Sequence, residues 1–144
     1  MIQHLDGYVL KKPLSNNVLQ SIEGVHSVLN NPISEHSLNI VGTSFPYDGV
    51  QIYGWKSPIA KHKDNTGFIL FMPLSIVAGS DEIVSEDSSV SLKVGHIYLL
   101  DDTKEHYTVG DGNVVALFFG SFKESELCDQ LYSAVFDQFE SYVQ

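Results

Sequence analysis

Two segments decide how this chain folds: His62-Lys63-Asp64, and His106 followed by the apolar run Val114-Val115-Ala116-Leu117-Phe118-Phe119. In extended chain, residues two apart point to the same face, so His62 and Asp64 share a face while Lys63 points away. His106 reaches the same place only if a closed antiparallel sheet brings it back. Two imidazoles and one carboxylate can hold one iron(II) ion and leave other coordination positions open. The sequence therefore predicts a metal site made of His62, Asp64 and His106.

Apolar and alternating segments around these residues predict a β structure. Residues 68–74 are apolar on both faces, which is typical of a buried central strand, and Pro73 predicts an interruption or end of its ladder. Residues 79–91 are rich in acidic side chains and serines and predict a surface hairpin. Further strands are predicted at residues 2–10, 37–43, 50–55, 96–100, 107–109 and 114–119. Short strands punctuated by turns favour a β-sandwich or jelly roll over a parallel α/β sheet.

Two helices are predicted to flank the strands. Ser15 is a plausible N-cap for a helix at about residues 15–30, whose apolar stripe consists of Val18, Ile22, Val25 and Leu29. A second helix is predicted at about residues 124–142, with the stripe Leu127, Leu131, Val135 and Phe139. The predicted fold class is therefore mainly β (α+β), with residues 1–144 as a single domain and its β core at about residues 37–120.

Composition and charge narrow the classes of partner. The formal net charge is −10, and the chain contains eight lysines but no arginine, so no basic patch for direct nucleic-acid binding is visible. An acidic surface of this kind could instead engage a basic protein by mimicking nucleic acid.

No apolar run approaches the roughly 20 residues of a membrane span. No signal peptide is visible at the N-terminus, which predicts a cytoplasmic location. Cys128 is the single cysteine, which excludes an internal disulfide.

The order of motifs over about residues 50–120 resembles the double-stranded β-helix of the iron(II)/2-oxoglutarate-dependent oxygenases. His62-x-Asp64 precedes an apolar strand, the strand Gly95-His96-Ile97-Tyr98-Leu99-Leu100 follows, and His106 precedes the last apolar run. The resemblance implies that His62, Asp64 and His106 ligate iron(II). It also implies 2-oxoglutarate as co-substrate and the hydroxylation of a small molecule or a protein side chain.

The chain departs from that family where the co-substrate binds. The family places an arginine, or sometimes a lysine, about ten residues beyond the distal histidine, where it pairs with the far carboxylate of 2-oxoglutarate. Here that position falls near Ala116, and the nearest lysines, Lys93 and Lys123, match no position of the motif. Hydroxyl groups that could anchor a co-substrate instead are those of Tyr53, Tyr98 and Tyr107.

Because no arginine or lysine is present at that position, two further interpretations remain open. One is a cupin-type metalloprotein that uses no 2-oxoglutarate, in which His96 is a possible fourth ligand. The other is a non-catalytic acidic binding or inhibitor protein on the same fold. In that reading a basic partner is engaged by the acidic hairpin residues Asp81, Glu82, Glu86 and Asp87. Trp55 and Tyr53 share a strand face just before the metal segment, and both are candidates to line a substrate pocket.

Overall fold

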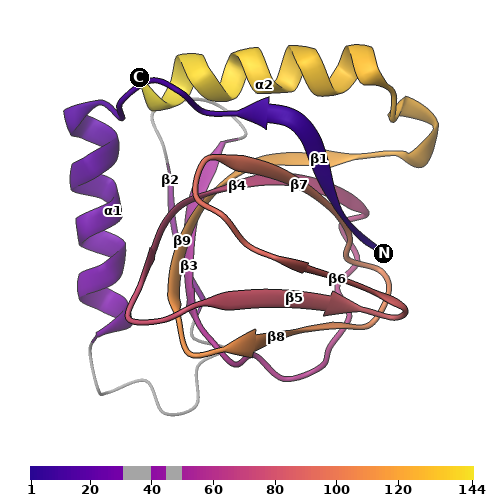
Figure 1. The fold of residues 1–144 in the computed structure, drawn as a ribbon, viewed down its shortest axis with the longest axis horizontal. Coiled ribbons are helices and arrows are strands. Elements are labelled where there is room, and N and C mark those ends of the chain that lie inside the picture. Colours follow the sequence, from indigo (N-terminus) through magenta and orange to yellow (C-terminus); the bar gives the residue numbers. More distant parts are fainter. Residues whose placement is uncertain (31–39, 45–49) are drawn as a thin grey trace.

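A computed structural model describes residues 1–30, 40–44 and 50–144 of the chain. Its elements run in the order β1 (Ile2–Val9), α1 (Asn16–Leu29), β2 (Ile40–Ser44), β3 (Gln51–Lys56), β4 (Phe68–Val77), β5 (Asp81–Ser85), β6 (Ser88–Ser91), β7 (His96–Asp101), β8 (His106–Gly110), β9 (Asn113–Phe122), a short 3-10 helix η1 (Glu124–Glu126) and α2 (Asp129–Val143) (Figure 1). The predicted strands and both helices are present. Residues 37–39 of the predicted strand 37–43 lie outside the described residues.

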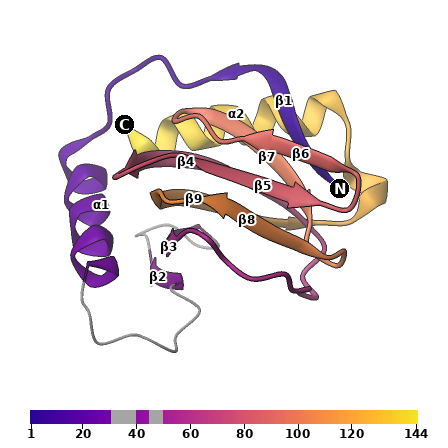
Figure 2. The same ribbon diagram turned by 60° about the horizontal axis from the view of Figure 1, so that its bottom comes forward.

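The strands form two antiparallel sheets. The larger sheet has six strands in the order β1-β7-β4-β9-β3-β2, and the smaller has three in the order β6-β5-β8. An isolated antiparallel bridge between His62 and His106 adds the segment before β4 to the free side of β8. From β3 to β9 the chain therefore passes back and forth between the two sheets, which is the winding of a jelly roll. Figure 2 shows β5, β6 and β8 as one layer over β4, β7 and β9. The predicted fold class is confirmed.

Two apolar clusters cover the two faces of the larger sheet. On β9, Val115 and Leu117 belong to the cluster that also contains buried residues of α1 and α2. Their neighbours Val114 and Ala116 belong to the cluster between the two sheets. Since side chains alternate across a strand, a strand that is buried on both faces must be apolar throughout. This explains the unbroken apolar run at the end of the β region.

The first helix follows its predicted pattern. The Ser15 hydroxyl accepts a hydrogen bond from the Val18 backbone N–H at 3.3 Å, as an N-cap does. The buried residues of α1 are Val18, Ile22, Val25 and Leu29, the four that the sequence predicted. The stripe packs α1 against the larger sheet.

The second helix begins later than predicted. The segment expected to start it forms the separate 3-10 helix η1, and α2 begins only at Asp129. The Glu126 carboxylate turns back and accepts a hydrogen bond from the Lys123 backbone N–H at 2.8 Å. Leu127 and Cys128 then adopt extended backbone angles, which prevents the two helical segments from merging.

Pro73 interrupts pairing without ending its strand. The register between β4 and β9 shifts between Pro73 and Ser75, and β4 continues to Val77. Proline has no N–H to donate to the ladder, which accounts for the predicted interruption. Within the described part of the chain, no helix has the length and apolarity to cross a membrane.

We predict that a methyl group at Gly54 of β3 destabilises the fold, because α1 rests directly on this residue. A Cβ there would lie 2.3 Å from Val25 Cγ1 and 2.9 Å from Leu29 Cδ1. Gly54→Ala should therefore lower the free energy of unfolding by about 1–3 kcal/mol through overpacking. The matched control is Gly24→Ala on α1, where a Cβ meets nothing within 4 Å and should stabilise the helix by up to about 1 kcal/mol. Urea unfolding of both variants measures the difference; equal stability would contradict this packing.

Candidate metal centre

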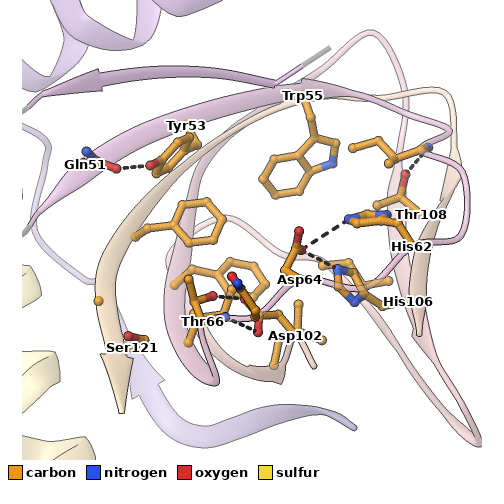
Figure 3. A pocket seen from close by; sticks show the side chains of 18 residues that line it. Gln51, Tyr53, Trp55, His62, Asp64, Thr66, Asp102, His106, Thr108 and Ser121 are labelled. Carbon is orange, nitrogen blue, oxygen red and sulfur yellow. Dashed lines mark hydrogen bonds and ion pairs between the residues drawn. The ribbon is translucent and has the colours of Figure 1, made fainter. Parts of the chain in front are cut away.

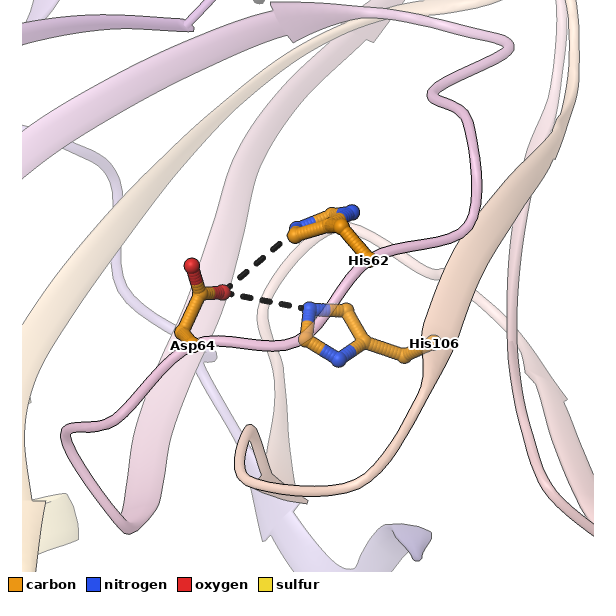
Figure 4. A group of neighbouring side chains, drawn as sticks. All are labelled: His62, Asp64 and His106. Carbon is orange, nitrogen blue, oxygen red and sulfur yellow. Dashed lines mark ion pairs between the residues drawn. The ribbon is translucent and has the colours of Figure 1, made fainter.

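A backbone bridge places two histidines side by side. The His62 N–H donates to the His106 carbonyl, and the His106 N–H donates to the His62 carbonyl, each at 3.0 Å. Directly opposed residues of an antiparallel pair project their side chains to the same face. The two imidazole rings accordingly lie with their centroids 4.3 Å apart (Figure 4).

Each imidazole is oriented by a carbonyl two residues earlier in the chain. His62 Nδ1 lies 2.8 Å from the Ala60 carbonyl oxygen, and His106 Nδ1 lies 2.9 Å from the Lys104 carbonyl oxygen. A carbonyl oxygen can only accept, so Nδ1 carries the hydrogen in both rings. In a neutral imidazole the other nitrogen, Nε2, then presents a lone pair. Metal-ligating histidines are held in this way by a hydrogen bond on the nitrogen that faces away from the metal.

Asp64 completes the group. Its Oδ2 atom lies 3.4 Å from the Nε2 atom of His62 and 3.4 Å from the Nε2 atom of His106. The three ligand atoms all fall within 4.8 Å of one another. The His106 side chain is 8% exposed, that of His62 30% and that of Asp64 51%, so the group is anchored in the sheet and open on one side. Three lone-pair donors this close repel one another unless a proton or a metal ion lies between them, and the donor set fits a divalent metal ion.

Asp102 fixes the loop that carries Asp64. The Asp102 backbone carbonyl accepts a hydrogen bond from the Asp64 N–H at 2.7 Å. Its buried carboxylate accepts from the N–H groups of Thr66 and Gly67, at 3.2 and 2.8 Å, and also from the Thr66 hydroxyl. Sequence reasoning did not indicate that Asp102 supports the site. Its partners lie about 36 residues away, and no local pattern pairs them.

The three ligands lie at one side of a pocket of about 470 Å³ between the sheets (Figure 3). The pocket wall is mainly apolar and includes the aromatic residues Tyr53, Trp55, Phe71 and Phe118. The other lining residues are Gln51, Ile59, Asn65, Thr66, Ile69, Ile83, Leu100, Asp102, Thr108, Gly120 and Ser121. A concave, largely apolar pocket with a few polar groups at its edge has the character and size of a small-molecule site.

The predicted tyrosines lie in different places. Tyr53 lines the pocket, and its hydroxyl donates to the Gln51 side chain. Tyr98 lies outside the pocket lining and is 1% exposed, with its hydroxyl between the Lys93 N–H and the Ser91 carbonyl. Tyr107 lines a separate shallow groove, where the Lys61 ammonium lies 5.5 Å from its ring centroid. Only Tyr53 of the three is positioned to meet a ligand in the pocket, and its anchoring role stays a prediction.

His96 is not assembled with the candidate ligands. His96 Nδ1 lies 2.9 Å from His4 Nε2, so its described partner is another histidine on β1. The described metal-ligating group contains no fourth residue.

No lysine is among the described residues that line the pocket. Ala116 is completely buried in β9, at the position where a cation would have been expected. Lys93 and Lys123 are likewise absent from the lining residues. The charged side chains in the lining are the carboxylates of Asp64 and Asp102.

Asp81 corrects the prediction of an entirely exposed acidic hairpin, because it is 3% exposed. Its Oδ2 atom accepts hydrogen bonds from Trp55 Nε1, at 3.1 Å, and from the Ser57 hydroxyl, while its Oδ1 atom is buried and has no hydrogen-bond partner among the described residues. Burial raises the pKa of the Asp81 carboxyl from 3.8 to about 6, although hydrogen bonds from Ser57, Trp55 and the Glu82 backbone act in the opposite direction. Asp81 thus supports the pocket wall at Trp55 and is unsuited to contact a partner.

No protein family model matches this chain, and no curated protein sequence matches it. Among solved structures, the chain is similar to a cupin-2 domain protein of Shewanella frigidimarina, with 15% identity over 69% of this chain and 91% of that one and a TM-score of 0.49. Protein NMB1881 of Neisseria meningitidis matches with 13% identity over 74% and 99% of the two chains and a TM-score of 0.48. The Drosophila melanogaster CENP-C cupin domain matches with 8% identity over 74% and 100% and a TM-score of 0.39. The fold assignment rests on the strand order described above.

We predict that Asp81 makes the protein less stable as the pH rises from about 4 to 7. Its folded-state pKa is raised, so its contribution to stability is fully present below pH 3.8 and is lost as the pH rises through about 6. A shift of about two units corresponds to roughly 3 kcal/mol over that window. Asp81→Asn should remove this part of the pH dependence, as measured by urea unfolding at several pH values. The control is Asp87→Asn in the exposed β5–β6 turn, which should keep the wild-type slope. A wild-type slope in Asp81→Asn would contradict the assignment.

Proposed function

We propose that this protein is a metal-dependent oxygenase that holds one iron(II) ion between His62, Asp64 and His106. The observation that supports the proposal is the convergence of three lone-pair donors, two of which belong to imidazoles whose Nδ1 atoms are already engaged by backbone carbonyls. Two imidazoles and one carboxylate, with open positions, are typical of non-haem iron(II) oxygenases. Iron(II) in such a set supplies redox chemistry with dioxygen, which no side chain of this protein can supply.

The protein residues have separate tasks in this proposal. The backbone bridge holds both imidazoles, and the Ala60 and Lys104 carbonyls keep their Nε2 atoms aimed at one point. Asp102 holds the loop of Asp64, the most exposed of the three ligands. The aromatic wall provides an apolar space beside the ligands in which a substrate is held and water is displaced.

We further propose that the reaction does not use 2-oxoglutarate. That co-substrate carries two carboxylates, and the one that does not chelate iron needs a buried cation as its partner. The pocket lining contains no lysine, and the chain contains no arginine. The Tyr53 hydroxyl alone is a weak substitute for a guanidinium group. These facts favour a cupin-type oxygenase that acts on a small molecule without a 2-oxo acid.

Anaerobic calorimetric titration with iron(II) tests the metal site. Wild-type protein should bind one equivalent, and His106→Ala and Asp64→Ala should each weaken binding by more than about a hundredfold, since changes around the ligands alone cost 10–100-fold. His96→Ala is the matched control, because this histidine lies outside the site, and it should bind iron(II) like wild type. Thermal unfolding of each variant verifies that it is folded. Binding that survives in Asp64→Ala would contradict the ligand assignment.

Absence of iron(II) binding by folded wild-type protein would overturn the oxygenase proposal as a whole. The acidic-binding reading would then take its place, with Glu82, Glu86 and Asp87 as the remaining candidates from the hairpin. Their charge reversal should weaken capture of a basic partner.

A second titration tests the co-substrate. Addition of 2-oxoglutarate to the iron-loaded protein should produce no visible charge-transfer band, because the pocket offers no partner for its distal carboxylate. A band that appears with wild type and is lost in Asp64→Ala would show that 2-oxoglutarate chelates the metal here. That result would reject this part of the proposal while leaving the metal site in place.

A further inference from the structure

We propose that the ligand of the pocket is an uncharged aromatic compound that carries a hydrogen-bonding substituent. That this ligand is also the substrate of a reaction rests on the proposed function. Its binding depends on the pocket wall, so it can be tested without a metal ion.

The pocket wall is built from aromatic rings that contact one another through Phe118. The Phe118 ring lies 5.3 Å from Phe71 in a stacked arrangement, 4.9 Å from Tyr53 edge to face, and 6.4 Å from Trp55. These are the spacings at which aromatic pairs attract one another. A ligand ring in the pocket extends this set of contacts with faces and edges that are already in place. Aliphatic side chains, among them Ile59 and Ile69, complete the apolar surface.

The charge of the pocket disfavours an anionic ligand. The lining contains the carboxylates of Asp64 and Asp102 and no lysine. A ligand carboxylate would lose its hydration on entry, would find no lysine or arginine side chain among the lining residues, and would lie near the carboxylates of Asp64 and Asp102. With a divalent ion bound, its two positive charges balance the two carboxylates while both imidazoles are neutral. An uncharged ligand therefore suits the loaded pocket best.

Polar groups are available where the pocket meets solvent. The side chains of Asn65 and Ser121 are exposed, line the pocket, and have no hydrogen-bond partner among the described residues. The Thr66 hydroxyl, by contrast, is engaged by Asp102. Asn65 and Ser121 can therefore donate a hydrogen bond to a substituent of the ligand, or accept one from it, while the ligand ring lies against the aromatic wall.

Trp55 is the single tryptophan of the chain and lines the pocket, so its fluorescence reports on binding. Benzyl alcohol, benzylamine and benzoate present the same ring with no charge, a positive charge and a negative charge. Each is titrated into metal-free protein and into zinc-loaded protein. Benzyl alcohol should change the fluorescence in both, and in the zinc-loaded protein it should bind at least about tenfold more tightly than benzoate and more tightly than benzylamine.

Failure of this inference differs from failure of the proposed function. If benzyl alcohol does not bind while iron(II) does, the ligand class is wrong and the metal site stands. If benzyl alcohol binds the metal-free protein and no metal binds, the pocket stands and the oxygenase proposal fails. Tightest binding of benzoate or of benzylamine to the zinc-loaded protein would overturn the statement that the ligand is uncharged.

A variant that adds a positive charge to the pocket tests whether the lack of one disfavours anionic ligands. Ser121→Arg places a guanidinium group at the pocket edge, and it should raise the affinity for benzoate about tenfold or more through a bidentate ion pair. The matched control is Ser89→Arg on β6, which adds the same charge at an exposed position outside the pocket lining. It should leave benzoate binding unchanged. Equal effects of the two variants, or none from Ser121→Arg in folded protein, would contradict the proposed role of charge in selecting the ligand.

Discussion

The reciprocal hydrogen bonds between His62 and His106 are the constraint on which the rest of the site depends. They join the segment before β4 to the edge of β8, and they set two imidazoles on the same face of the smaller sheet. A pair of backbone bonds at 3.0 Å defines side-chain direction more tightly than a loop does. Because His106 belongs to a strand that is also paired with β5, the smaller sheet holds this side of the site in place.

The position of Asp64 depends on a different set of hydrogen bonds. Its loop is held through Asp102, whose backbone and carboxylate together satisfy the N–H groups of three residues. Asp81 has a comparable task on the opposite wall, where it holds Trp55 and Ser57. The two buried carboxylates are thus structural supports of the pocket. Asp102 also lines it together with Asp64 and contributes to its negative character, so stability and ligand preference are linked through Asp102.

The sequence predicted the parts of the structure that depend on periodicity. The stripe of α1 and the apolar run of β9 follow from the spacing of residues along one element. The side chains of His62 and Asp64 lie together as predicted, although Asp64 is in a loop and not in a strand. The sequence could not predict that Asp81 is buried, because acidic residues between serines look like a surface turn and its partners, Trp55 and Ser57, lie on β3 and just after it. The predicted start of α2 was too early. The hydrogen bond from the Lys123 backbone N–H to the Glu126 carboxylate closes a separate short turn in a segment whose sequence pattern is otherwise helical.

Nitrogen NMR of the imidazoles tests the central claim most directly, because it reports separately on Nδ1 and Nε2 of each histidine. In zinc-loaded protein, His62 and His106 should each keep the hydrogen on Nδ1, which faces a backbone carbonyl, and bind zinc through Nε2. Addition of one equivalent of zinc should shift the Nε2 signals of these two residues and leave those of His4 and His96 unchanged. Unshifted Nε2 signals of His62 and His106, or a shift confined to His4 and His96, would contradict the account.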